Sequence, residues 1–153
     1  MNTPINKATD CYIAGPWFTP EAMDIVETIK SMLFKMEQSF FSPKDDCLFD
    51  PKKMTPSYVL DINIAALKAT NYVIVITDGQ DAGTLFEAGW CYAKDVPIIY
   101  VWLGGKPEDK FNIVLAASGA VCRDFRQLEN AIQDYIKTDK VEIKNWGVET
   151  EYE

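Results

Sequence analysis

Apolar residues along this chain switch repeatedly between two spacings, one typical of strands and one typical of helices. Continuous apolar runs at 72–77 (YVIVIT) and 98–103 (IIYVWL) are typical of central parallel strands that are covered on both faces. Shorter runs predict three further strands, at 11–14, around 39–42 and at 120–123. The pattern therefore predicts a sheet of five strands.

Helical spacing occupies the segments between these strands. After Pro20, apolar residues recur every three or four positions up to Met36, which predicts a helix. Thr55 and Pro56 suit the N-cap and first turn of a second helix that continues to about Lys68. Three more helices are expected, at 81–94 (DAGTLFEAGWCYAK), at about 109–117 and at about 126–136.

This alternation predicts an α/β fold with a doubly wound, flavodoxin- or Rossmann-like sheet, mostly parallel and flanked by helices. A chain of 153 residues suits one such domain over residues 1–153, with 1–9 and about 145–153 as flexible tails. In these sheets ligands bind beside the loops that follow the strands. The loops GPWFT, DGQDAGT and GGKPEDKFN are therefore the expected walls of one pocket.

Composition narrows the chemistry. A net charge of -8 argues against nucleic acid as a partner. The chain has no histidine and its four cysteines are scattered, so we expect neither a metal nor another cofactor, and carboxylates must supply any acid and base groups. No apolar run is long enough to cross a bilayer and the N-terminus does not resemble a signal peptide, which predicts a cytoplasmic protein with reduced thiols.

Glu87 is the one charged residue in the apolar run Leu85 to Ala93. Thr84 and Glu87 fit a capping box, in which the two side chains satisfy amides at the helix start. The alternative is a functional role, because this helix is expected to be buried nearly all round and a buried charge must be paired or used. In the first helical turn, the helix dipole would keep Glu87 ionised, as a nucleophile requires.

Other candidate site residues have equally ordinary explanations. Asp61 lies among apolar residues in YVLDINIAALKA and fits a solvated helix face. Asp81 fits turn chemistry six residues before Glu87. Trp17 and Phe18 follow the first strand, where they could stack on a planar ring or simply complete the core.

Taken together, the segments YIAGPWF (12–18), YVLDINIAALKATNYVIVITDGQDAGTLFEAGWCYAK (58–94) and FNIV (111–114) resemble the nucleoside 2-deoxyribosyltransferase family over about residues 11–118. The specific element is an Asp and a Glu-x-Gly six residues apart, joined to Asp61 upstream and Asn112 downstream. The resemblance implies an enzyme that exchanges the purine or pyrimidine base of 2'-deoxynucleosides through a covalent deoxyribosyl intermediate.

The resemblance also implies roles for individual residues. Glu87 would be the nucleophile, Tyr12 would orient its carboxylate, and Asp61 would contact the base and assist its protonation. Asp81 and Asn112 would fix the substrate, Asn112 from a neighbouring subunit of a homo-oligomer, either a dimer or a hexamer built from dimers. The expected lining of the substrate site is completed by Gly15, Trp17, Phe18, Gly83 and Val114.

The residues of this chain, which has carboxylates but no histidine, suit the family's reaction, since glycosyl transfer with retention needs a carboxylate nucleophile and a proton donor but no metal. Val114 and Pro16 depart from the family pattern.

One alternative is a hydrolase on the same scaffold, the 2'-deoxynucleoside 5'-monophosphate N-glycosidases, which have a small hydroxyl residue where this chain has Asp81. A carboxylate there would repel a phosphate, which favours free nucleosides. The other alternative is a noncatalytic nucleotide-sensing domain.

Overall fold

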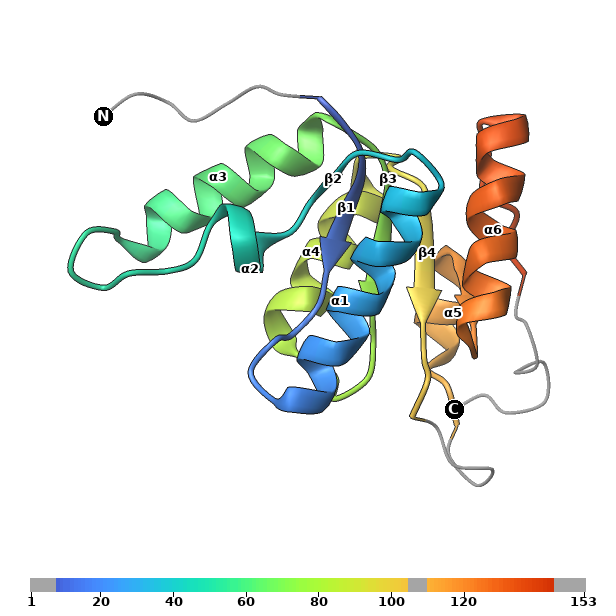
Figure 1. Ribbon diagram of the computed structural model, residues 1–153, viewed down its shortest axis with the longest axis horizontal. Coiled ribbons are helices and arrows are strands. Elements are labelled where there is room, and N and C mark those ends of the chain that lie inside the picture. Colours follow the sequence, from blue (N-terminus) through green and yellow to red (C-terminus); the bar gives the residue numbers. More distant parts are fainter. Residues whose placement is uncertain (1–7, 105–109, 145–153) are drawn as a thin grey trace.

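One five-stranded parallel sheet forms the centre of the molecule (Figure 1). The computed structural model describes residues 8–104 and 110–144. All four pairs of neighbouring strands are parallel, and the strand order is β2-β1-β3-β4-β5. The strands are β1 (Thr9–Ala14), β2 (Phe40–Phe41), β3 (Thr70–Ile76), β4 (Ile98–Val101) and β5 (Ala120–Cys122). This order confirms the predicted doubly wound α/β fold and places its switch point between β1 and β3.

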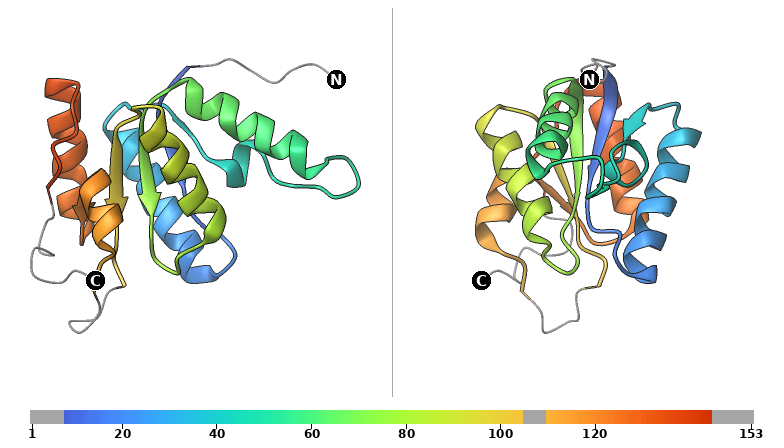
Figure 2. Two further views of the ribbon diagram at one scale, coloured as in Figure 1. Left: turned by 180° about the vertical axis from the view of Figure 1, so that it is seen from behind. Right: turned by 90° about the vertical axis from the view of Figure 1, so that its left-hand side faces the viewer.

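Helices cover both faces of the sheet, as the two views of Figure 2 show. The helices α1 (Pro20–Lys35) and α6 (Phe125–Thr138) pack on one face. The opposite face is covered by α3 (Pro56–Lys68), α4 (Ala82–Ala93) and α5 (Ile113–Ser118). A one-turn helix after β2, α2 (Pro43–Asp46), was not predicted from the sequence.

Alternation along β1 decides which side chains reach which helix layer. Cys11 and Ile13 enter the core beneath α1 and α6, whereas Tyr12 and Ala14 enter the core beneath α3 and α4. Tyr12 is therefore directed toward the helix that carries Glu87. Because both layers are apolar, the strands read as continuous hydrophobic runs in the sequence.

Most predicted ends of strands and helices agree with the structure to within a few residues. The strand β4 ends at Val101, two residues earlier than expected, and α5 starts only at Ile113. Most residues of the predicted tails and of the loop GGKPEDKFN lie outside the described ranges. Within the described ranges, no helix combines the length and apolarity needed to span a membrane, and all four cysteines are free and buried.

Candidate active site

A direct contact joins the first strand to the fourth helix. The Tyr12 hydroxyl donates a short hydrogen bond to Oε2 of Glu87. The ring of Tyr12 is fully buried, and it is stacked on Phe41 of β2 with a centroid distance of 5.4 Å and an interplanar angle of 17°. The two residues that the sequence analysis paired are thus brought together, and the phenol is fixed by the sheet rather than by a loop.

The start of α4 differs from the capping box that the sequence suggested. Asp81 is the N-cap, and its Oδ2 accepts hydrogen bonds from the Thr84 amide at 3.0 Å and the Thr84 hydroxyl at 2.9 Å. Glu87 lies in the second turn of the helix, so its carboxylate takes no part in capping. The capping-box interpretation is therefore wrong, and the carboxylate of Glu87 is left available for another role.

The environment of Glu87 favours its protonated form. Burial raises the pKa of Glu87 to about 7; the hydrogen bond from Tyr12 lowers it, and the charge of Asp81 raises it further. The expectation that the helix dipole keeps this group ionised is wrong, because Glu87 is past the first turn and desolvation dominates. A carboxylate with a pKa near 7 is more basic than an ordinary glutamate but still ionised in a large fraction of molecules at neutral pH.

A cavity of about 320 Å³ lies between α3 and α4 with Glu87 in its wall. Its volume is within the range of small-molecule sites. Except for Glu87 and Asn63, its lining is apolar or glycine: Phe49, Pro56, Val59, Leu60, Ile64, Gly83 and Phe86. The cavity therefore pairs one reactive carboxylate with surfaces that suit a planar, weakly polar ring.

A second cavity, of about 380 Å³, lies at the carboxyl ends of β1 and β3 and includes Asp81 and Phe18. Gly15, directly after β1, is buried, and a Cβ there would approach Cδ1 of Ile76 to 2.7 Å, so a larger residue would require the Ile76 side chain to move. Phe18 is exposed, and its ring lies against the half-buried Trp17 with a centroid distance of 5.0 Å. Glu87 thus lines one of the two cavities and Asp81 lines the other, and the charge of Asp81 acts on Glu87.

Three predicted site residues do not reach Glu87 within one chain. Asp61 is exposed and is not part of the α3 face that lines the Glu87 cavity. Asn112 is exposed and caps α5, where its Oδ1 accepts from the amides of Val114 at 2.9 Å and Leu115 at 3.2 Å. Val114 lines a different cavity, between α4 and α5. Of the three candidate carboxylates, Glu87 and Asp81 interact through their charges within one chain, whereas Asp61 does not line the Glu87 cavity.

Sequence reasoning missed three residues near the site. Phe41 supports the ring of Tyr12, but the short strand that carries it was only weakly indicated. Asp78 accepts hydrogen bonds from the amides of Leu103 at 3.1 Å and Gly104 at 2.5 Å, which ties the loop before Asp81 to the end of β4. Asn63 was hidden among apolar neighbours, although its spacing from Pro56, Val59 and Leu60 places it on one helical face.

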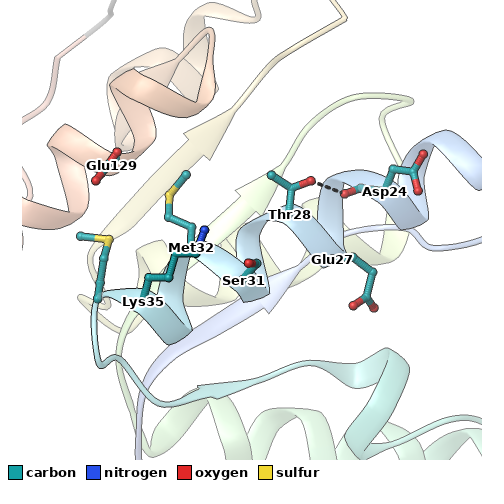
Figure 3. Close-up of a pocket in the computed structure, with 8 residues that line it drawn as sticks. Asp24, Glu27, Thr28, Ser31, Met32, Lys35 and Glu129 are labelled. Atoms are coloured by element: carbon teal, nitrogen blue, oxygen red, sulfur yellow. Dashed lines mark hydrogen bonds between the residues drawn. The ribbon is translucent and has the colours of Figure 1, made fainter.

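A larger groove, of about 800 Å³, lies on the opposite side of the sheet between α1 and α6 (Figure 3). Asp24, Glu27, Thr28 and Lys35 project from α1, and Glu129 faces them from α6. These side chains are exposed, and none belongs to the predicted site. In the described part of the chain, no three metal-ligating residues of the His, Cys, Asp or Glu type are grouped to hold a metal ion.

A family model and two solved structures match this chain, the first by sequence and the other two by fold. A family model described as nucleoside 2-deoxyribosyltransferase matches residues 11–132. A solved 2-deoxyribosyltransferase from Bacillus psychrosaccharolyticus has 22% sequence identity and a TM-score of 0.68, over 79% of this chain and 90% of that one. A conserved protein from Enterococcus faecalis V583 has 16% identity and a TM-score of 0.71, over 83% of this chain and 98% of that one. No curated protein matches the sequence.

Proposed function

The chain belongs to the nucleoside 2-deoxyribosyltransferase family, and we propose that it exchanges the base of 2'-deoxynucleosides through a covalent intermediate on Glu87. The observation that carries the proposal is the contact between Tyr12 and the partly buried carboxylate of Glu87 in the wall of a cavity of ligand size. A buried carboxyl group with a strongly perturbed pKa and a fixed partner is typical of a reacting group.

The reaction has two displacements at one carbon. In the first, a carboxylate oxygen of Glu87 forms a bond to C1' of the sugar while the bond between C1' and the base breaks, and the base nitrogen takes up a proton. In the second, a new base attacks C1', loses its proton, and releases the ester to regenerate Glu87. Two inversions restore the starting configuration. Because the sugar lacks its 2'-hydroxyl, the positive charge that develops on the ring is less destabilised.

Tyr12 and Asp61 would have separate roles, Tyr12 at the Glu87 carboxylate and Asp61 at the leaving base. Tyr12 donates to Oε2, which leaves Oε1 of Glu87 as the attacking oxygen and fixes the plane of the carboxylate. Its own pKa is held far above the ordinary value by burial and by Glu87, so it stays a hydrogen-bond donor throughout. Asp61 is proposed as the partner of the leaving base only on the strength of its place in the family motif, since within one chain it does not line the cavity that contains Glu87.

Free nucleosides are the proposed substrates. Among the described residues, the second cavity is lined by Asp78 and Asp81 and by no lysine or arginine, so it would repel a 5'-phosphate.

A serine at position 81 keeps the N-cap but removes a charge that would repel a 5'-phosphate. We expect Asp81→Ser to shift the ratio of kcat/KM for a deoxynucleoside over its 5'-monophosphate by about 10- to 100-fold toward the nucleotide. Asp81→Asn is the matched control, because it removes the same charge but does not introduce a hydroxyl group. Unchanged ratios in both variants would contradict the assignment of Asp81 to the 5' side.

A homo-oligomer is proposed because α4 and α5 leave large apolar side chains uncovered. Phe86, Tyr92, Ile113 and Val114 are all more than half exposed, so the expectation that α4 is buried nearly all round fails for the single chain. Exposed apolar side chains that gather around one hollow, as Tyr92, Ile113 and Val114 do, are typical of protein interfaces. We propose that a second copy covers it and that Asn112 and Val114 complete the neighbour's site.

Subunit complementation tests the shared site. We expect Glu87→Gln and Asn112→Ala to be nearly inactive as separate proteins, since each lacks one half of every site. After dissociation and mixing, each mixed dimer should regain one intact site, and about a quarter of wild-type activity should return in a random mixture. Mixing Glu87→Gln with Asp81→Ala, both from the same side of the site, is the control. Equal recovery in the two mixtures would rule out a contribution of Asn112 in trans.

The direct test of the activity is base exchange. The protein is incubated with deoxyuridine and adenine, and new deoxyadenosine is measured by chromatography, with parallel reactions that contain a deoxynucleotide donor or no acceptor base. Deoxyadenosine in the first reaction supports the transferase. Release of free base and deoxyribose 5-phosphate from the nucleotide alone would instead identify a hydrolase. Such an exchange would serve nucleotide salvage, and the four free, buried thiols suit the reducing cytoplasm that we propose as its location.

A further inference from the structure

Asn63 is the polar residue on an otherwise apolar face of α3. Pro56, Val59, Leu60, Asn63 and Ile64 follow the spacing of one helical stripe, and all five line the cavity that contains Glu87. Besides Glu87 itself, Asn63 is the only side chain of this lining that can form hydrogen bonds. The cavity therefore has one reactive group and one amide, and apolar walls between them.

One atom of the Asn63 amide, its oxygen, lacks a hydrogen-bond partner in the described part of the chain. Its Oδ1 is buried from solvent and accepts no hydrogen bond from the described residues. Buried polar groups in folded proteins are nearly always paired, and leaving one unpaired destabilises the fold. A leucine would suit this stripe better. Since the χ2 torsion of an amide is soft, rotation about Cβ–Cγ would turn either polar atom of the group toward the cavity.

We propose that Asn63 determines base specificity by pairing with the edge of the base, an inference that rests on the function proposed above. An asparagine amide offers one acceptor and one donor side by side, which matches an exocyclic amino group next to an unprotonated ring nitrogen. Adenine and cytosine carry such an edge. The amide cannot transfer a proton, so the role of Asn63 is recognition and not acid catalysis.

The apolar walls agree with a planar base as the occupant. Phe49, Leu60 and Phe86 are each about half exposed in the single chain, and a ring placed between them would remove apolar surface from water. Hydrophobic contact of this kind is similar for all bases, so it cannot distinguish an amino group from a hydrogen. Discrimination then falls to the hydrogen bonds of Asn63.

A competition between adenine and unsubstituted purine isolates this contact, because the two bases differ only in the amino group. With deoxyuridine as donor, we expect the wild-type protein to prefer adenine by about tenfold or more. The variants Asn63→Leu and Asn63→Ala should bring the ratio of the two products close to one. Because both products form in one tube, the ratio does not depend on how much of each variant is folded. Asn130→Leu, on α6 across the sheet, is the control and should keep the wild-type ratio.

The intact mass of the wild-type protein, measured with donor alone, separates two kinds of failure. If neither a deoxyribosyl adduct nor any exchange product forms, the proposed function itself is wrong. If exchange occurs but the wild type shows no preference for adenine, or both Asn63 variants keep that preference, the function stands and the role of Asn63 is overturned.

Discussion

Glu87→Gln is expected to reduce base exchange by about 10⁴-fold or more, while the fold is retained. Glutamine has nearly the shape of glutamate and can still accept a hydrogen bond from Tyr12. Its amide is a far weaker nucleophile, so no ester with the sugar should form. The rate is measured by chromatography of the new deoxynucleoside, and circular dichroism reports the fold.

Glu129→Gln, an exposed change of the same kind on α6, is the matched control and should leave the rate unchanged. A Glu87→Gln protein with a rate within tenfold of wild type would rule out covalent catalysis by this residue. Loss of activity without loss of nucleoside binding also separates the transferase from a noncatalytic sensor, in which binding alone is the function.

The second large effect is on stability, and its size depends on pH. The folded protein holds the pKa of Glu87 at about 7, above the ordinary value of 4.5. Between these two pH values the folded state keeps a proton that the unfolded chain has already released, so wild-type stability falls as pH rises through this window. Glutamine does not ionise. We therefore expect the stability advantage of Glu87→Gln over wild type to grow by about 3 kcal/mol between pH about 4 and about 8.

Urea unfolding of the two proteins across this pH range measures the effect. The difference in unfolding free energy should change mainly between the two pKa values and level off above the higher one. A constant difference would mean that Glu87 ionises as easily in the folded protein as in the unfolded chain. Such a result would remove the physical basis for a buried, reactive carboxylate.

Part of this site was predictable from local sequence because strand and helix periodicity fix where residues emerge. The apolar run that contains β3 ends at Thr77, in the loop segment that leads to Asp81, and Tyr12 belongs to the described strand before the first helix. Parallel strands bring these ends to one edge, which made a pocket beside the loops that follow β1 and β3 a reasonable expectation. The contact between Tyr12 and Glu87 was expected only from the family resemblance. The family motif added the roles of the residues.

Other features depend on choices that local sequence leaves open. Asp81 and Thr84 are both good caps, three residues apart, and the exit of the chain from β3 decides that Asp81 is used. That one-turn difference moves Glu87 out of the helix start and reverses the expected shift of its pKa. Likewise, an apolar helix face has the same sequence pattern whether its own chain or a second copy covers it. The exposure of Phe86 and Tyr92 could therefore not be predicted.

The central claim is that Glu87 carries the sugar. Its most direct test is the mass of the wild-type protein after brief incubation with a deoxynucleoside and no acceptor base, followed by fragmentation to locate the modification. We predict a mass increase of one deoxyribosyl group on the peptide that contains Glu87, lost again when a free base is added and absent from Glu87→Gln. Base exchange that proceeds with no adduct on Glu87, or with an adduct on another residue, would contradict the account.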